Sequence, residues 1–554
     1  MALASSCYNF AAVQRLGISS CSKFNSRGFL STRNTSIFPR YFCRFMASSG
    51  MVQVKESISL SEKEKKIFNR LLDVLRHFKL QTQLRVAGGW VRDKLLGKEC
   101  YDIDIALDDM LGREFCEKVN EYLAYAGEEQ QGVGVIQCNP DQSKHLETAR
   151  MRIYDMWIDF VNLRSETYVE NSRIPTMKFG TAEEDAYRRD LTINSMFYNI
   201  NTDSVEDLTG RGLSDLRSGL IVTPLPPKAT FLDDPLRVLR AVRFGARFGF
   251  LLDEELKKAA ADDEVKSAIA EKISRERIGH EIDLMISGNH PVTAIKYICE
   301  LQLFWVVFSL PQKPEPAITE ECDRLFSCMD AAWNILQLIG CSIFSEDQRR
   351  LYLYAALFLP LRKSIPVTTF FFRNSLKLKA SDAETVASLH SASENFLLLI
   401  SLIEGQDSDI ADANLEEEIL CVPQSSKRRI FAGLLLRQIK DFWRVALMLS
   451  ALLHDTGENM ETFPCQTAQL EQRRQLFRRI ENSIAELGLD NIWEMKPLLD
   501  GKAIMNVLQL KTGGPLVREW QQRVLKWQLS HPLGTAEECL DWISQSNTKR
   551  AKLL

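Results

Sequence analysis

Two patterns are missing from this sequence, and each absence excludes a class of protein. None of the 13 cysteines belongs to a Cys-x-x-Cys pair or to a zinc-finger spacing, which argues against a structural zinc domain. The cysteines are scattered, some within apolar runs, as is typical of reduced thiols in an intracellular protein. No uninterrupted apolar run is long enough to span a bilayer, so we expect no membrane partner.

The chain also lacks an overall positive charge. Its net charge is −4, so a nucleic-acid partner must be bound by local basic patches rather than by a globally cationic surface. The length of 554 residues allows several domains. A hydrophobic content of 45% with 26% charged residues is normal for a soluble globular protein.

Acidic residues are absent from the first 50 residues, and the first one in the chain is Glu56. The segment is rich in serine, and its arginines are spread among apolar residues. This composition is typical of a transit peptide, although a disordered tail is an alternative. We interpret residues 1–50 as a leader for the mitochondrion or the chloroplast. Starts at Met46 or Met51 would remove it and give cytoplasmic or nuclear forms.

The segment Val86–Ala106 combines a Gly88-Gly89 turn with two nearby aspartates. Residues 101–107 alternate polar and apolar side chains, which predicts a half-buried strand. Residues two apart on a strand share a face, so Asp102 and Asp104 lie side by side. Two carboxylates this close favour a bound cation, and their oxygens suit Mg²⁺. Because the glycine turn allows backbone N–H groups to approach a triphosphate, the segment predicts a metal–nucleotide site.

The rest of the first 200 residues predicts a small head of mixed structure. A helix follows a capping box at Ser61 and Glu64, and apolar segments at 133–137, 146–153 and 156–163 predict strands of one sheet. Asp159 lies on the last of these strands. It is either a third catalytic carboxylate or an ordinary solvent-facing residue, and the sequence leaves both alternatives open.

Two further segments carry charge or flexibility near this predicted site. In Tyr187–Ile200, a charged Arg-Arg-Asp cluster precedes an apolar stretch of helical length. Such a cluster is usually a solvated cap, but beside a triphosphate site Arg189 is a candidate phosphate ligand, since a guanidinium matches phosphate oxygens in pairs. Asp207–Leu216 contains two glycines and predicts a loop that can close over a substrate.

The segment Phe231–Phe250 predicts a helix that starts at Pro235. Arg237, Arg240 and Arg243 recur every three residues and fall roughly along one side. A basic stripe is often only a solvated face, but its register with an aspartate at the helix start favours ligand binding. From about residue 253 onward the patterns are almost wholly helical. We therefore predict an α+β protein with a small mixed-sheet head followed by an all-helical neck, body and tail.

Together these motifs resemble the CCA-adding tRNA nucleotidyltransferases of the bacterial and eukaryotic class, class II of the polymerase-β-like superfamily. The resemblance runs from about residue 60 to about residue 520 in the order typical of the family. The motifs that carry it are Gly88-Gly89-x-Val91-Arg92-Asp93, Asp102-x-Asp104, Arg188-Arg189-Asp190, Asp207–Leu216, Asp234-Pro235-Leu236-Arg237, Arg275-Glu276-Arg277-Ile278, Leu499-Asp500-Gly501 and Gly513-Gly514-Pro515. One departure is Asp233, where the family usually has glutamate.

The resemblance implies an enzyme that adds C, C and A to tRNA 3′ ends from CTP and ATP, without a nucleic-acid template and with Mg²⁺ as cofactor. Asp102 and Asp104 would bind two metal ions, with Asp159 as a candidate further catalytic residue, and pyrophosphate would be released. The implied nucleotide contacts are Gly89, Arg92, Arg189, Asp234, Arg237, Arg240 and Arg243.

Base selection by this family has a chemical rationale at Asp234 and Arg237. Cytosine and adenine both present an amino donor beside a ring-nitrogen acceptor, whereas uracil and guanine present the reverse polarity. One carboxylate acceptor and one guanidinium donor can therefore accept the first pair and refuse the second. Each mismatch leaves buried polar groups unpaired at a cost of about 1–3 kcal/mol.

The resemblance and the patterns together predict the domain organisation. Residues 1–50 form the leader, 51–200 the catalytic head, 201–290 the helical neck with the base-reading helix, and 291–554 a helical body and tail that bind tRNA. Basic clusters at 427–429 and 473–479 either face tRNA phosphates or are solvated helix faces. The pair His454-Asp455 is interpreted as a helix end rather than as a phosphohydrolase metal motif, and the oligomeric state is not predicted.

Two alternative functions remain open at this point. A template-independent poly(A) polymerase would share every head motif, and a catalytically inactive RNA-binding relative would share the fold. The leader and the Gly-Gly-Pro tail favour CCA addition over the first alternative. The intact Asp102 and Asp104 pair, with Arg189, Asp234 and Arg237 all present, argues against the second.

Overall fold

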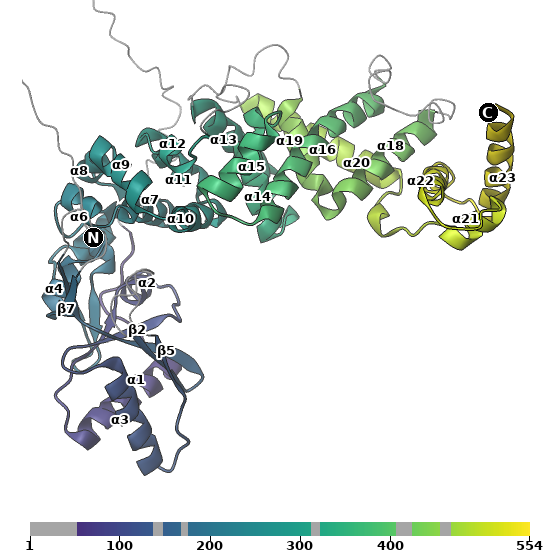
Figure 1. The fold of residues 1–554 in the computed structure, drawn as a ribbon. Helices are drawn as coiled ribbons and strands as arrows, with labels where there is room; N and C mark the ends of the chain where they lie inside the picture. Colours follow the sequence, from purple (N-terminus) through teal and green to yellow (C-terminus); the bar gives the residue numbers. More distant parts are fainter. Residues whose placement is uncertain are drawn as a thin grey trace, which may run out of the picture. The chain divides into compact units, whose positions relative to one another are not determined.

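The computed structural model describes residues 52–136, 148–167, 176–311, 322–405, 424–454 and 467–553. The predicted leader, the alternative starts Met46 and Met51, and Asp455 lie outside the described residues. Strands gather in the N-terminal part and helices form nearly all of the rest (Figure 1), which confirms the predicted α+β class.

A seven-stranded sheet with the order β3-β4-β5-β2-β1-β8-β9 forms the centre of the head. Only the neighbours β2 and β5 are parallel, and the other pairs are antiparallel. All three strands predicted downstream of the aspartates are present. The strands are β1 (Leu84–Ala87), β2 (Ile103–Leu107), β3 (Val133–Ile136), β4 (Thr148–Ile153), β5 (Met156–Asn162), β8 (Phe197–Asn199) and β9 (Ser204–Glu206). A separate hairpin pairs β6 (Arg164–Thr167) with β7 (Thr176–Phe179).

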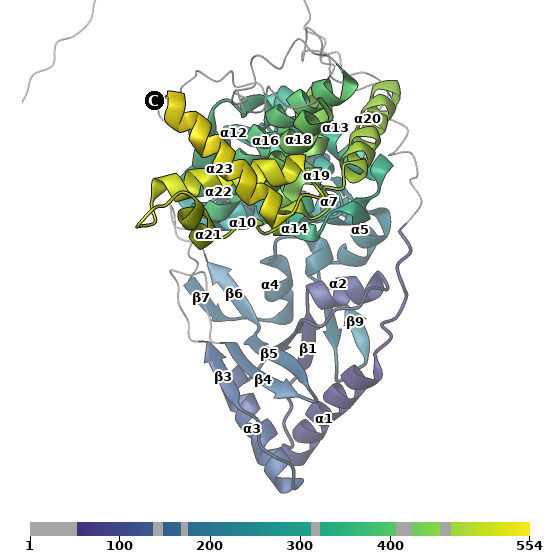
Figure 2. The same ribbon diagram turned by 90° about the vertical axis from the view of Figure 1, so that its right-hand side faces the viewer.

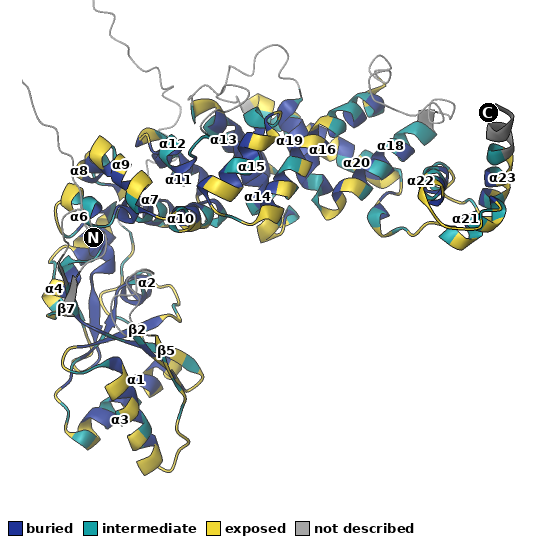
Figure 3. Cartoon of the chain, viewed as in Figure 1, coloured by how far each residue is buried: buried dark blue, intermediate teal, exposed yellow. Residues whose placement is uncertain are grey.

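One face of this sheet is covered by the helices α1 (Glu62–Phe78) and α3 (Gly112–Tyr125), which contact each other (Figures 1 and 2). The predicted capping box begins α1: the Ser61 N–H donates to Glu64 Oε2 over 2.7 Å, and the Glu64 N–H donates to Ser61 Oγ. Figure 3 shows the strands of the head largely buried, and Ile103 and Ile105 of β2 belong to the same buried core cluster as Phe115 and Val119 of α3. Their neighbours on the strand therefore point to the other face, where the site lies.

Two local predictions are wrong for the segment between the sheet and the neck. The apolar stretch after Arg189 is not a helix, because it forms the short 3₁₀ turn η3 (Thr192–Asn194) and then β8, which pairs with β1. A short, fully buried apolar run has no periodicity that separates strand from helix. The charged cluster instead follows the end of α4 (Ala182–Tyr187).

The second correction concerns Asp207–Leu216, which was expected to be a loop. Helix α5 (Gly212–Ser218) begins within it, and Asp207 Oδ2 accepts the Leu213 N–H over 2.9 Å near the helix start. Asp215 is buried and accepts the hydroxyl of Thr192 over 2.7 Å. Hydrogen bonds of the Asp207 and Asp215 side chains therefore hold a glycine-containing segment in a partly helical form that its composition alone assigns to a loop.

Within the predicted neck, residues 201–290, lie the helices α6 (Pro227–Asp233) and α7 (Leu236–Phe248), and α7 follows Pro235 as predicted. A short parallel pair, β10 (Leu220–Ile221) and β11 (Leu251–Leu252), packs beside α7. The helices that follow are α8 (Glu254–Ala260), α9 (Asp263–Lys272), α10 (Arg275–Ser287), α11 (Pro291–Glu300), α12 (Phe304–Val307), α13 (Cys322–Ile339), α14 (Glu346–Leu357), α15 (Ile365–Phe370), α16 (Ala380–Glu404), α18 (Gln424–Ile439), α19 (Trp443–Leu453), α20 (Thr467–Glu486), α21 (Gly501–Val507), α22 (Pro515–Ser530) and α23 (Ala536–Leu553).

Helix α16 is the one described helix whose length and composition would suit a bilayer, with 25 residues and a mean hydropathy of 1.4. It contacts α14, α18 and α19, and its Leu389, Phe396 and Leu399 side chains are fully buried. These contacts are those of a core helix in a helical bundle. Such a helix can be as long and as apolar as one that spans a membrane.

The basic clusters of the body are partly neutralised within the chain. On α20, Arg474 pairs with Glu471, Arg478 with Glu481, and Arg479 with Glu404 of α16. In the tail, a small separate core forms around Trp520 and contains residues of α21, α22 and α23. Both sequence motifs of the tail start helices, since Asp500 caps α21 and Pro515 opens α22.

Candidate functional site

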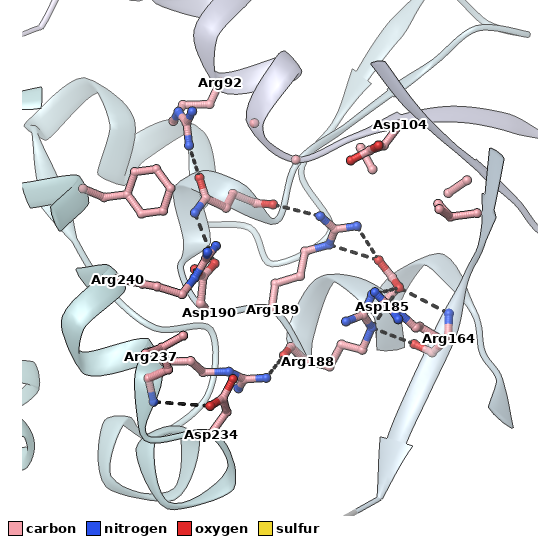
Figure 4. A pocket seen from close by; sticks show the side chains of 18 of the residues that line it. Arg92, Asp104, Arg164, Asp185, Arg188, Arg189, Asp190, Asp234, Arg237 and Arg240 are labelled. Atoms are coloured by element: carbon pink, nitrogen blue, oxygen red, sulfur yellow. Dashed lines mark hydrogen bonds and ion pairs between the residues drawn. The ribbon is translucent and has the colours of Figure 1, made fainter. Parts of the chain in front are cut away.

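A cavity of about 520 Å³ lies between the open face of the sheet, the turn before α2 (Gly89–Leu95), and the neck helices α7 and α10 (Figure 4). This volume suits a ligand of nucleotide size. Eight arginines and four aspartates line it, so its net charge is positive and favours a polyanion. The arginines are Arg92, Arg164, Arg188, Arg189, Arg237, Arg240, Arg247 and Arg277, and the aspartates are Asp104, Asp185, Asp190 and Asp234.

The predicted carboxylate pair lies at the edge of this cavity. Asp104 of β2 lines the cavity, and Asp102 is exposed just before the strand begins. Asp159 of β5 is the register partner of Asp104 across the parallel pair. Burial, followed by repulsion from Asp102 and Asp159, raises the pKa of Asp104 to about 6. Burial and two neighbouring carboxylates thus make the ionised form of Asp104 costly in the absence of a cation.

The donor set fits Mg²⁺ that is shared with a substrate. Among the described residues, no group of three or more His, Cys, Asp or Glu side chains is arranged to hold a metal ion by itself. Mg²⁺ is commonly bound by one or two carboxylates, with phosphate oxygens and water completing the octahedron. Asp102 and Asp104 can supply those two carboxylates.

Asp159 is placed beside the pair but has a partner of its own. Its Oδ1 lies 2.9 Å from Arg150 Nε, and Asp159 does not line the cavity. Burial raises the pKa of Asp159 despite this ion pair. The structure therefore brings together all three predicted carboxylates, while the role of the third stays a prediction.

The glycine turn lies against the cavity as the sequence predicts. Gly88 has φ of +70°, and a Cβ there would lie 2.7 Å from Arg189 Nη1. Any other residue would therefore be strained in its backbone and would displace a cavity-lining guanidinium. Gly89 also lines the cavity and is the first residue of α2.

A buried carboxylate, Asp185 of α4, positions the two arginines of the Arg-Arg-Asp motif. Arg188 Nε donates to Asp185 Oδ1 over 2.9 Å, and Arg189 Nη2 donates to Asp185 Oδ2 over 2.7 Å. Burial by itself would raise the pKa of Asp185, but the two guanidiniums outweigh this effect and lower it. Sequence analysis missed Asp185. Its position four residues before Arg189, a spacing at which an acidic and a basic side chain meet when the chain follows a helical turn, is the signal that would have found it.

A second buried carboxylate, Asp190, joins the head to the neck. Its Oδ2 accepts from Arg240 Nε of α7 over 2.7 Å, and its Oδ1 accepts from Asn194 Nδ2 over 3.1 Å. Burial opposes ionisation, but the ion pair with Arg240 and the bond from Asn194 lower the pKa of Asp190 to about 2. Arg240 is thus fixed at the cavity wall.

Arg92 extends this network into α2. It donates to Asn194 Oδ1, and its Nε donates to Asp93 Oδ1 over 2.9 Å. Its guanidinium carbon lies 4.9 Å from the ring centre of Phe244 and 4.7 Å from that of Phe248. Burial lowers the pKa of Arg92, while the carboxylate and the aromatic faces favour its charged form.

The two predicted base readers both line the cavity, at the start of α7. Asp234 Oδ2 lies 3.3 Å from Arg277 Nη2 of α10, and Arg237 Nη2 donates to the carbonyl oxygen of Arg188 over 2.8 Å. Figure 4 shows Asp234 and Arg237 on the side of the cavity away from Asp104. Sequence analysis listed Arg277 within a motif but assigned it no role at the site.

Arg243 is the one predicted nucleotide contact of α7 that does not line this cavity. Its Nε lies 2.6 Å from Glu281 Oε2 of α10, and it lines a separate cavity of about 270 Å³. Arg247, seven residues after Arg240, lines the nucleotide-sized cavity instead. Each residue of a helix turns by about 100°, so three residues fall roughly 60° short of a full turn, whereas seven residues nearly return to the same face.

Comparison with known proteins shows which family carries these motifs. Residues 84–222 match the poly A polymerase head domain family. The mitochondrial CCA tRNA nucleotidyltransferase of Candida glabrata is 34% identical over 88% of this chain and 96% of its own length. The chain belongs to the CCA tRNA nucleotidyltransferase family.

Solved CCA-adding enzymes share the fold at lower identity. One solved in complex with CTP has a TM-score of 0.55 at 18% identity, covering 88% of this chain and 96% of that one. The enzyme of Thermotoga maritima, solved with tRNA, has a TM-score of 0.54 at 18% identity, covering 88% and 96%. As a family member the chain is a nucleotidyltransferase, which confirms the resemblance seen in its motifs and the prediction that it is an enzyme.

The raised pKa of Asp104 predicts that this family member is less stable when the carboxylate is ionised. The pKa of Asp104 is about 6 in the folded protein, against an ordinary value of 3.8 for an aspartate in the unfolded chain. The free energy of unfolding therefore falls as the pH rises through this interval. We expect Asp104→Asn to unfold at a higher temperature than wild type at pH 8 in EDTA, with the difference vanishing near pH 4. Exposed Asp109→Asn is the control. Equal melting temperatures at pH 8 would contradict the electrostatic account.

Proposed function

We propose that this protein adds C, C and A to the 3′ ends of tRNA, using CTP and ATP and releasing pyrophosphate. The observation that carries the proposal is that Asp104, Asp234 and Arg237 line a single cavity although they are far apart in the sequence. The cavity thus combines a carboxylate for metal-assisted transfer with an acceptor and a donor for base selection. The names of the Candida glabrata relative and of the solved CCA-adding enzymes support it.

The incoming triphosphate would bind at the glycine turn. Gly88 and Gly89 expose the backbone there, and Arg189 lies across the turn. Asp185 holds the Arg189 guanidinium in place, so less conformational entropy is lost when a phosphate binds. Arg92 and Arg240 are fixed on the same cavity wall by the Asp190 and Asn194 network. We infer that they contact the ribose or the phosphates.

Asp102 and Asp104 would hold Mg²⁺ in this proposal. Two bound Mg²⁺ ions would activate the 3′-hydroxyl of the primer and neutralise charge at the α-phosphate and the leaving pyrophosphate. The raised pKa of Asp104 supports a cation site, since a cation would relieve the repulsion among the three carboxylates. Asp159 would orient Arg150 or complete the metal site, and the two roles stay open.

Base choice would lie with Asp234 and Arg237. Their carboxylate and guanidinium can accept from the amino group and donate to the ring nitrogen of C or A, and they oppose the reversed edge of U or G. Arg277 and the Arg188 carbonyl hold these side chains in place. A guanidinium carries five N–H donors in a fixed fork, so Arg237 can contact a base while bound to the backbone. Arg243 would act indirectly, through α10.

The remaining proposals concern the rest of the chain. We propose that residues 51–200, together with the sheet strand β9 just beyond the predicted boundary, are the catalytic head, that the rest of 201–290 is the neck, and that 291–554 are the helical body and tail that bind the tRNA. We also propose that residues 1–50 direct the protein to the mitochondrion or the chloroplast. The acid-free composition of the leader and the mitochondrial name of the Candida glabrata relative support the first destination.

A primer-extension assay tests the main proposal. Labelled tRNA without its CCA end is incubated with the protein, Mg²⁺ and CTP, ATP or both. We expect two cytidines followed by one adenosine when both nucleotides are present. A long adenosine tail would show a poly(A) polymerase, in line with the head-domain family name, and no extension would indicate an inactive relative. Asp102→Ala should abolish addition while the protein stays folded, with a melting temperature no lower than that of wild type.

A second prediction concerns selectivity. Asp234→Asn keeps the shape of the side chain but removes the charge and adds a donor, so U and G should be tolerated. We expect misincorporation of U and G relative to C and A to rise about 5- to 150-fold, equivalent to about 1–3 kcal/mol. Asp262→Asn is the matched control, because Asp262 pairs with Lys228 over 2.9 Å outside the cavity. Unchanged selectivity in Asp234→Asn would remove it as a base reader.

A third prediction concerns targeting. Residues 1–50 fused to a fluorescent reporter should enter an organelle, because the segment is cationic and contains no acidic residue. Replacing its five arginines with glutamine is the control and should leave the reporter in the cytosol. A purely cytosolic signal from the unaltered fusion would contradict the leader assignment.

A further inference from the structure

The face of the sheet that carries the carboxylates continues beyond them to Trp157. Trp157 lies two residues before Asp159 on β5, so the two side chains share a face. The register pairs Ile103 with Ile158 and Asp104 with Asp159, which places Trp157 alongside Asp102. A tryptophan therefore neighbours the carboxylates proposed to bind the metal.

Trp157 is unusual in being open to solvent. It is 51% exposed, and it is the one tryptophan among the exposed large apolar side chains of the described residues. Its ring is held by Arg150 of β4, whose guanidinium carbon lies 5.4 Å from the ring centre. The same Arg150 pairs with Asp159 over 2.9 Å. Arg150 thus contacts both the Trp157 ring and a carboxylate of the cluster.

The nucleotide cavity and Trp157 lie on opposite sides of Asp104 along the strands. The cavity is lined by Asp104, Ala106, Val161 and Asn162, toward the C-terminal ends of β2 and β5. Trp157 lies toward the N-terminal ends of the same strands. In an in-line transfer the attacking hydroxyl and the leaving pyrophosphate occupy opposite sides of the α-phosphate. In the proposed reaction the primer end would therefore approach from the side of Trp157.

We propose that Trp157 is a stacking platform for the terminal base of the RNA primer, whose 3′-hydroxyl receives the new nucleotide. This inference rests on the proposed CCA addition. The primer end changes identity with every addition, so the contact that holds it must tolerate any base. Stacking on an aromatic ring meets this requirement, because every base has a π-face. Unpaired RNA ends are commonly bound in this way.

The charges around the ring fit the same ligand. Arg150 is 45% exposed, and Arg152, the register partner of Trp157 on β4, is 52% exposed. Both guanidiniums lie next to the place where the phosphates of the primer end would pass. Because Arg150 also offsets the charge of Asp159, the RNA backbone meets less repulsion near the catalytic carboxylates.

The test uses the full-length chain and an acceptor-stem minihelix that lacks CCA. Since base–aromatic stacking is worth about 1–3 kcal/mol, Trp157→Ala should weaken minihelix binding in EDTA about 5- to 150-fold and raise the KM for the minihelix similarly. The KM for CTP should stay within about twofold, because Trp157 lies outside the nucleotide cavity. Trp157→Phe should restore most of the affinity. Tyr125→Ala, a 73% exposed aromatic at the end of α3, is the matched control and should change neither value.

An abasic primer end provides the decisive comparison. Without a terminal base there is no stack to lose, so wild type and Trp157→Ala should bind the abasic minihelix equally. Unchanged binding of the normal minihelix by Trp157→Ala, or an equal loss on the abasic one, would overturn the inference. Failure of wild type to extend the minihelix would instead reject the proposed function, so the two failures are distinguishable.

Discussion

The ion pair between Asp190 and Arg240 is the interaction on which the site depends. Asp190 is buried at the junction of head and neck, where an unpaired carboxylate would be strongly destabilising. It keeps its charge because Arg240 of α7 and Asn194 of η3 bond to its two oxygens, and Asn194 in turn accepts from Arg92 of α2. One carboxylate therefore fixes α7, which carries the proposed base readers, relative to α2 and η3 beside the glycine turn.

The charges of the cavity divide into two sets with opposite requirements. The arginines on the nucleotide side are held by buried carboxylates, Asp185 and Asp190, whose pKa values are lowered, so this part of the site is organised before a ligand arrives. Asp104 instead has a raised pKa, because burial and two neighbouring carboxylates oppose its ionisation. The first set is satisfied within the protein, while the second is suited to a cation from outside.

Much of the head could be predicted from sequence because its signals are local. The capping box at Ser61, the strand alternation around Asp104 and the proline before α7 each depend on neighbouring residues, and all three are confirmed. The errors occurred where the signal was weak. The run after Arg189 is buried on all sides, so it has no periodicity that separates β8 from a helix. Asp207–Leu216 is partly helical, because Asp207 and Asp215 make side-chain hydrogen bonds that composition does not show.

The sequence alone pointed to the family, the fold class and most of the predicted residues that line the cavity, because motifs and periodicity are properties of short segments. Only the tertiary structure decided which arginines of α7 reach the cavity, since the helical turn of about 100° per residue turns Arg243 toward Glu281 and brings Arg247 to the wall. It also decided that Trp157 lies beside the carboxylates, because strand register is set by pairing between β2 and β5, more than fifty residues apart.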